Sequence, residues 1–345
     1  MNNRSKYTFI IPAYNAEATI SRAISSITSG MEDYEILVAE NGSDDDTSVT
    51  VEKIASQNDR IQLLHTEKGV SNARNAGIAK ASGEWLIFVD ADDVWITDEK
   101  TLDNLTDSLQ AADIIICSYL KDDVPVVHDY MDMNVNLSGQ QVADVYKWML
   151  SKTTLRMTVW AKLYKRETVI NGGIAFDKDL RLSEDADFLI QMLSISKSAA
   201  VSDLPVYRYC SDMPSVVRST DKTRVASYLH ALEKISEKIP DDMPEYTDFV
   251  LAHLNLICVH DIFNYGSELS GGEKRRLLES VLNHPVIKGA VARVEFKDIK
   301  SINKIPAFFF KHKVYAAGGL ICSVRALQNM RKQRKAARSK EELKQ

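Results

Sequence analysis

Short apolar runs alternate with longer amphipathic segments over roughly the first third of the chain. The runs are rich in β-branched residues and predict strands at residues 7–11, 35–40, 61–65, 85–89 and 113–118. The segments between them carry apolar residues at helical spacing and predict crossover helices at residues 18–28, 47–56, 71–81 and 101–110. This alternation predicts an α/β fold, with a mostly parallel central sheet flanked by helices in a Rossmann-like arrangement.

The pattern becomes less regular after residue 118 and then helical. Residues 119–140 are acidic and irregular, whereas residues 141–150 and 184–195 predict helices and residues 158–165 and 206–209 predict extended segments. A helical pattern interrupted by prolines runs from residue 224 to 338. Because 345 residues is long for a single domain, we predict a sheet domain at 1–225 and a helical C-terminal domain at 226–345.

Composition places the chain among ordinary globular proteins. It is 45% hydrophobic and 26% charged, with a net charge of −5, which argues against a protein built as a whole to coat nucleic acid. Its four cysteines form no C-x-x-C pair, so neither a zinc site nor a disulfide framework is indicated. The apolar run at 7–11 is too short for a signal peptide, and the apolar stretch at 305–324 is interrupted by charged residues. These features predict a cytoplasmic location.

Polar residues follow the predicted parallel strands, where ligands of such sheets bind. No G-x-G and no P-loop occurs in the chain, which disfavours dinucleotide and P-loop nucleotide binding, and no glycine-rich loop follows the first strand, which weakens a nucleotidyltransferase hypothesis. Asp90, Asp92 and Asp93 follow the strand at 85–89. Three neighbouring carboxylates fit a divalent cation with a diphosphate, or else two of them only open a turn and cap the next helix.

Several strings have the order and spacing found in one enzyme family. Residues 9–15 (FIIPAYN), 35–43 (EILVAENGS), 69–84 (GVSNARNAGIAKASGE) and 88–93 (FVDADD) together resemble the family 2 glycosyltransferases of GT-A fold. Residues 160–164 (WAKLY) and 183–185 (SED) resemble the acceptor-side motifs of the same family. The Q-x-x-R-W signature of the processive synthases is missing, so the resemblance implies transfer of one sugar per encounter.

The resemblance also implies roles for individual residues. It implies that a nucleotide-sugar, taken to be a UDP-sugar, is contacted by Pro12, Ala13, Tyr14, Glu40, Asn41, Arg74, Asp90 and Ala91. Asp92 would bind Mn²⁺ or Mg²⁺, while Trp160 and Lys162 would contact the acceptor or the sugar. Asn41 departs from the family pattern, in which many members have a second acid at this position. From the residues alone, Tyr14 and Trp160 could equally pack in the core, and Arg74 could pair with a neighbouring acid.

A catalytic pair is implied by Glu184 and Asp185, although two acids at a helix start are also favoured by the helix dipole alone. By the resemblance, Asp185 is the general base of an inverting, metal-dependent hexosyltransferase of EC 2.4 type, and Glu184 holds the acceptor or tunes Asp185. The acceptor would be a glycan or a lipid-linked sugar of a bacterial surface polysaccharide or glycoconjugate. The alternatives are a non-catalytic module that binds a nucleotide-sugar or glycan on the same fold and, with less support, a nucleotidyltransferase.

The end of the chain is basic although the chain as a whole is acidic. Aromatic residues at 308–310 adjoin Lys311 and Lys313, and further bases follow at Arg325, Arg331, Lys332, Arg334, Lys335 and Arg338. Such a segment can lie on an anionic membrane surface, which predicts a peripheral enzyme at the inner face of the cell membrane. A solvated tail or a contact between copies in an oligomer is the alternative.

Overall fold

The computed structural model describes residues 5–152, 156–211, 223–240, 243–264, 267–295, 297 and 304–342, with side chains as far as Arg331. These residues form two compact units, the first within 1–148 and 157–219 and the second within 149–156 and 220–345. We refer to them as the sheet unit and the helical unit. The predicted domain boundary at residue 225 stays a prediction.

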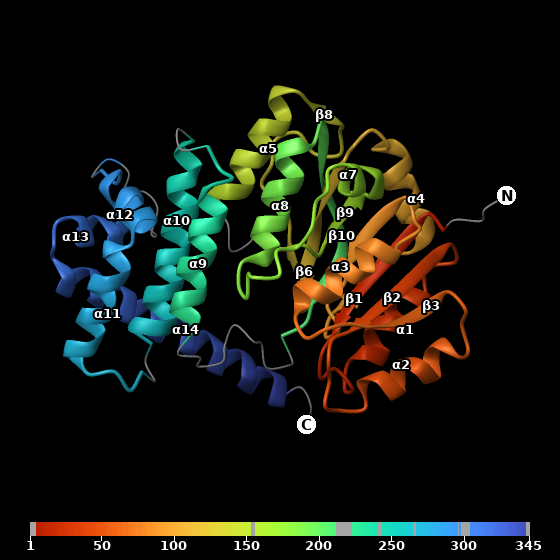
Figure 1. The fold of residues 1–345 in the computed structure, drawn as a ribbon, viewed down its shortest axis with the longest axis horizontal. Coiled ribbons are helices and arrows are strands. Elements are labelled where there is room, and N and C mark those ends of the chain that lie inside the picture. The colour runs from red at the N-terminus through yellow and green to blue at the C-terminus, as the bar shows by residue number, and fades with distance from the viewer. Residues whose placement is uncertain are drawn as a thin grey trace. The chain divides into compact units, whose positions relative to one another are not determined.

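The sheet unit is built on one mixed sheet with the strand order β3-β2-β1-β4-β9-β6-β10-β5 (Figure 1). Its strands are β1 (Tyr7–Ala13), β2 (Tyr34–Glu40), β3 (Ile61–His65), β4 (Trp85–Phe88), β5 (Val94–Trp95), β6 (Ile114–Lys121), β7 (Val124–Val126), β8 (Leu137–Ser138), β9 (Lys162–Lys165) and β10 (Ser198–Tyr209). The neighbours β3, β2, β1 and β4 run parallel, as do β6 and β10, whereas β9 is antiparallel to both of its neighbours. The α/β fold with a mostly parallel sheet is therefore confirmed.

Helices connect the strands and cover the sheet. They are α1 (Ile20–Thr28), α2 (Thr47–Ala55), α3 (Val70–Lys80), α4 (Glu99–Ser108), α5 (Gln140–Ser151), which extends past the edge of this unit, α7 (Arg166–Asn171) and α8 (Glu184–Ile195). Helix α3 lies very close to the sheet, because a Cβ at Gly77 would collide with the side chain of Ile10 on β1. This tight packing fixes Arg74, one helical turn before Gly77, relative to the end of β1.

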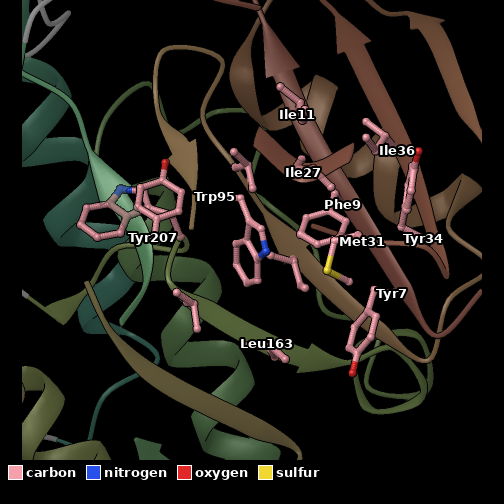
Figure 2. Close-up of a cluster of buried hydrophobic side chains, with 14 of the residues drawn as sticks. Tyr7, Phe9, Ile11, Ile27, Met31, Tyr34, Ile36, Trp95, Leu163 and Tyr207 are labelled. Atoms are coloured by element: carbon pink, nitrogen blue, oxygen red, sulfur yellow. The ribbon is translucent and has the colours of Figure 1, made fainter. Parts of the chain in front are cut away.

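The core explains why the strands read as unbroken apolar runs. Every residue of β1 and β2 is buried, as expected for strands covered on both faces. Figure 2 shows the cluster around Phe9 and Trp95, whose rings meet edge to face with centroids 5.1 Å apart. The burial of large aromatic side chains of this kind contributes most of the driving force for packing the sheet.

The helical unit contains α9 (Arg224–Ser236), α10 (Pro244–Leu256), the π-helical turn η2 (Ile257–Ile262), α11 (Gly271–Asn283), α12 (Pro285–Ala292), α13 (Lys304–Lys311) and α14 (Tyr315–Glu342). Within the residues that the structure describes, no helix combines the length and the apolar character needed to span a membrane. The C-terminal helices confirm the predicted helical pattern, although the π-helical turn was not predicted.

Candidate active site

Arg74 on α3 binds three carboxylates that come from two other elements. Its Nη1 donates to Asp185 Oδ1 at 2.6 Å and to Glu184 Oε1 at 3.2 Å, and its Nη2 donates to Asp90 Oδ1 at 3.2 Å. The side chain of Arg74 is buried, and its Nε has no hydrogen-bond partner among the described residues. The open alternative for Arg74 was a neighbouring acid on its own helix. The structure instead shows pairing with the end of β4 and the start of α8.

Negative charge exceeds positive charge around this guanidinium. Burial and the neighbouring charge of Asp185 raise the pKa of Glu184 to about 7, although Arg74 acts in the opposite direction. Burial likewise raises the pKa of Asp90 to about 6; the nearby charges of Asp185 and Asp92 add to this effect and Arg74 counteracts it. Acids held in this way gain ionisation when a further positive charge approaches. The cluster is therefore suited to receive a cation or a cationic complex.

Residues 90–93 follow β4 and form what we call the aspartate loop, which is held from two sides. Asp93 accepts hydrogen bonds from Tyr207 Oη at 2.6 Å and from the backbone N–H of Cys210 at 2.7 Å, and the Asp92 carbonyl oxygen accepts one from Arg22. Burial, together with the charge of Asp90, raises the pKa of Asp93 to about 8. The next element is the strand β5, so the acids form a turn but do not cap a helix. The alternative in which two of these acids cap the next helix is therefore wrong.

The carboxyl of Asp185 is both fixed and accessible. One oxygen is held by Arg74, and the other, Oδ2, accepts a hydrogen bond from the backbone N–H of Val159 at 3.2 Å. Its side chain is still 21% exposed. Ser183 before it adopts a left-handed backbone conformation with φ of 66°, which turns the chain sharply into α8. A carboxylate held in this way keeps one orientation.

Lys162 contacts the segment 158–160, whose Val159 N–H binds Asp185. Its buried ammonium donates to the carbonyl oxygens of Thr158 at 2.6 Å and Trp160 at 3.4 Å. Burial lowers the pKa of Lys162 to about 7, and the charge of Asp185 opposes that shift. We predicted a cation that contacts the acceptor or the sugar. The ammonium instead contacts the protein's own backbone, so that role stays a prediction.

Trp160 is part of an aromatic stack. Its ring is nearly parallel to those of Tyr207 and Tyr209, with centroids 4.9 Å and 5.8 Å away, and the ring of Tyr119 meets it edge to face at 4.7 Å. Trp160 is buried and Tyr209 is half-buried. Core packing, the alternative for Trp160, is therefore present, and its predicted contact with a sugar remains untested.

Five of the predicted donor residues lie in the last residues of β1 and β2 or directly after these strands: Pro12, Ala13, Tyr14, Glu40 and Asn41. Pro12 and Ala13 pair with Ala39 and Glu40. Burial opposes ionisation of Glu40, but hydrogen bonds from Ser43, and one from His65, outweigh it and lower the pKa of Glu40. Tyr14 is 42% exposed, so it does not pack in the core, and its hydroxyl accepts a hydrogen bond from Lys68 at 2.8 Å. Asn41, directly after β2, is buried, and so is Ala91 in the loop that follows β4.

The structure thus brings together Arg74, Asp90, Glu184 and Asp185, which come from three separate segments of the sequence. Tyr207 was not predicted from the sequence. It links the aspartate loop to β10 by accepting from the Asp90 backbone N–H and donating to Asp93. Its position in the strand predicted at 206–209 could have indicated this role, because a buried tyrosine requires a polar partner for its hydroxyl.

Comparison with known proteins assigns the first half of the chain to a family. The family model described as "Glycosyl transferase family 2" matches residues 8–170, a range that includes β1 to β9 and the aspartate loop. Residues 8–170 are therefore a glycosyl transferase family 2 domain. In this glycosyltransferase, Glu184 and Asp185 lie beyond the matched range, but they bind residues inside it: both acids accept hydrogen bonds from Arg74, and Asp185 accepts another from the Val159 N–H.

Bacterial proteins are among the relatives of this glycosyltransferase. EpsH of Bacillus subtilis is 26% identical over 291 residues, which cover 81% of this chain and 82% of EpsH. The Escherichia coli protein WfgD, named as a glucosyltransferase that uses UDP-Glc and α-D-GlcNAc-diphosphoundecaprenol, is 40% identical over 95 residues, covering 27% of this chain and 37% of WfgD. The crystal structure of S. aureus TarS 1–349 in complex with UDP-GlcNAc has a TM-score of 0.66 at 18% identity, covering 95% of this chain and 92% of that chain. The fold is accordingly GT-A-like.

Proposed function

We propose that this family 2 glycosyltransferase transfers one sugar, with inversion, from a UDP-sugar to a hydroxyl group of a lipid-linked glycan in bacterial surface polysaccharide synthesis. The observation that carries the proposal is the Arg74 cluster, because it holds an accessible carboxylate, Asp185, against the aspartate loop that follows β4. The names of relatives support the substrate class, since WfgD is named for a UDP-sugar donor and a diphosphoundecaprenol acceptor.

In the proposed reaction, Asp185 takes the proton of the acceptor hydroxyl while the hydroxyl oxygen attacks the anomeric carbon on the face opposite the diphosphate. Arg74 and the Val159 N–H each hold one oxygen of Asp185, and this keeps its remaining lone pairs directed toward the acceptor. Glu184 is buried and shares Arg74 with Asp185. Its role would be to tune the base or to orient the acceptor sugar.

The acids also fit a divalent cation. Asp92 lies between Asp90 and Asp93 and is half-exposed, and it is the residue we assign to Mn²⁺ or Mg²⁺. No group of three or more acids, histidines or cysteines within the described ranges could hold a metal by itself. Such ions are commonly held by one or two carboxylates, with diphosphate oxygens and water completing the shell. When bound, the ion would neutralise charge on the departing diphosphate.

A donor screen tests this assignment directly. The chain contains four tryptophans, Trp85, Trp95, Trp148 and Trp160, and all belong to the sheet unit, so tryptophan emission follows the unfolding of that unit. A matched UDP-sugar with Mn²⁺, at a concentration about a hundredfold above its dissociation constant, should add about 2.7 kcal/mol and raise the melting temperature by several degrees. GDP-sugars and UDP-sugars without the metal should shift it less.

The other functions predict different results in the same samples. A non-catalytic module would show the thermal shift without releasing UDP, either to water or to an acceptor. A nucleotidyltransferase would release pyrophosphate from UTP and a sugar phosphate. If no nucleotide-sugar shifts the transition, the donor assignment is wrong.

Lys162 binds the backbone on both sides of Val159, whose N–H contacts Asp185. We therefore include Lys162 in the proposal as a positioning residue. Replacing it with methionine keeps the length of the side chain but removes the donor to Thr158 and Trp160. Loss of such a charged hydrogen bond costs about 1.5–3 kcal/mol. We therefore expect Lys162→Met to lower kcat about tenfold or more while KM for the donor and the donor-induced thermal shift stay near wild type.

The pH dependence of stability gives a second measurement on the same variant. The pKa of Lys162 is about 7 in the folded chain and about 10.4 when unfolded. Between these values the unfolded chain binds the extra proton, so this group makes the free energy of unfolding rise with pH. Lys162→Met should remove that part of the slope, whereas Lys165→Met, on the same strand β9 and half-buried, should keep both the slope and kcat. Equal effects of the two changes would contradict the positioning role.

A further inference from the structure

Helix α14 has two apolar faces near its start, and the residues that the structure describes cover one of them and leave the other exposed. Gly318, Gly319, Cys322 and Ala326 lie on the covered face, where a Cβ at Gly318 or Gly319 would collide with the rings of Phe310 or Phe263. Leu320 and Val324 lie one turn apart on the other face and are 66% and 46% exposed. Val314, directly before the helix, is also exposed. We call Val314, Leu320 and Val324 the exposed stripe.

Basic residues occur at both ends of the exposed stripe. Lys313 precedes it and Arg331 follows it, and both side chains are exposed. The sequence has no Asp or Glu between Asp298 and Glu341, although lysines and arginines recur throughout that stretch. In a chain of net charge −5, this is a strong local excess of positive charge.

We propose that the exposed stripe and its flanking bases lie on the surface of an anionic lipid membrane, with Leu320 and Val324 inserted at the level of the headgroups. A lipid interface satisfies both features at once, since it accepts apolar side chains and attracts bases through its negative surface potential. Nucleic acid would attract the bases but offers nothing to an exposed leucine and valine. A second copy of the same helix would bring two basic segments free of acids together, which like-charge repulsion disfavours.

This inference does not depend on the chemistry of the donor site. A lipid-linked acceptor would be found at such a surface, but binding to vesicles needs no sugar transfer. The two proposals can therefore fail separately. The insertion would be shallow, because no described helix is suited to cross the bilayer.

The test uses the full chain and sedimentation with vesicles of phosphatidylglycerol and phosphatidylcholine in equal amounts. Wild type should sediment with them, more weakly at high salt and weakly with phosphatidylcholine alone. The double variant Leu320→Glu/Val324→Glu should need about tenfold more lipid for half binding. The control Val49→Glu/Val135→Glu makes the same change of charge at positions of the sheet unit that are 61% and 47% exposed. It should bind like wild type.

Two results would overturn the proposal. One is wild-type protein that stays in the supernatant with anionic vesicles. The other is an equal loss of binding in both double variants, which would mean that overall charge and not the exposed stripe is responsible. Light scattering of the same proteins identifies the other occupant of this face. If wild type ignores vesicles and its mass falls only in Leu320→Glu/Val324→Glu, the stripe joins two copies of the chain.

Discussion

Replacing Asp185 with asparagine should reduce sugar transfer by about 10²–10⁴-fold, the range found when a positioned general base is removed. Asparagine keeps the size of the side chain, and its carbonyl oxygen can still accept a hydrogen bond from Arg74 or from the Val159 N–H. The change therefore removes the proton acceptor and leaves most of the surrounding packing in place. Release of UDP in the presence of acceptor, measured at saturating donor, reports the loss in kcat.

The neighbouring acid provides the matched control. Glu184 shares the same guanidinium, and burial raises its pKa to about 7, so at neutral pH it is already protonated in part. Glu184→Gln imitates that protonated form and should cost less, about tenfold. Both variants should retain the thermal shift with the matched UDP-sugar. If Glu184→Gln causes the larger loss, the roles of the two acids are reversed, and if Asp185→Asn keeps full activity, the base lies elsewhere.

The sheet unit could be predicted where strand and helix alternate with clear periodicity. The strands and crossover helices from β1 to α4 lie within a few residues of their predicted positions, and α8 begins and ends at the predicted residues. Strand β10 was predicted only from residue 206, because Ser202, Asp203 and Pro205 interrupt its apolar pattern. Its pairing with β6 shifts register at the same place. The short strands β5, β7 and β8 carry too few residues to show any period.

For the candidate site, the sequence indicated which residue types matter but not their partners. The expected contact of Arg74 with the nucleotide-sugar stays a prediction, and its partners within the protein lie 16, 110 and 111 positions away along the chain. No local pattern encodes contacts at such separations, because the packing of α3 and α8 onto the sheet creates them. The same reason explains Tyr207, which is 114 positions from Asp93.

Replacing Arg74 with methionine should cause the largest loss of stability among these changes. Methionine fills a similar volume but leaves Asp90, Glu184 and Asp185 without their shared cation. Removal of one partner from a buried ion pair costs about 3–5 kcal/mol, since the remaining charges lose their compensation. Denaturant unfolding followed by tryptophan emission measures this loss in the sheet unit, which contains all four tryptophans.

The loss should grow as the pH rises from 5 to 8, values that bracket the raised pKa of Glu184 of about 7. A buried acid with a raised pKa keeps its proton when the unfolded chain, with a pKa of about 4.3, has lost it, so the free energy of unfolding falls with rising pH. Without Arg74 the pKa of Glu184 rises further, and the fall becomes steeper. Arg224→Met removes the buried partner of Asp261 in the helical unit and should leave the tryptophan transition unchanged. A deficit in Arg74→Met that is the same at both pH values would mean that lost packing, and not unpaired carboxylates, destabilises the variant.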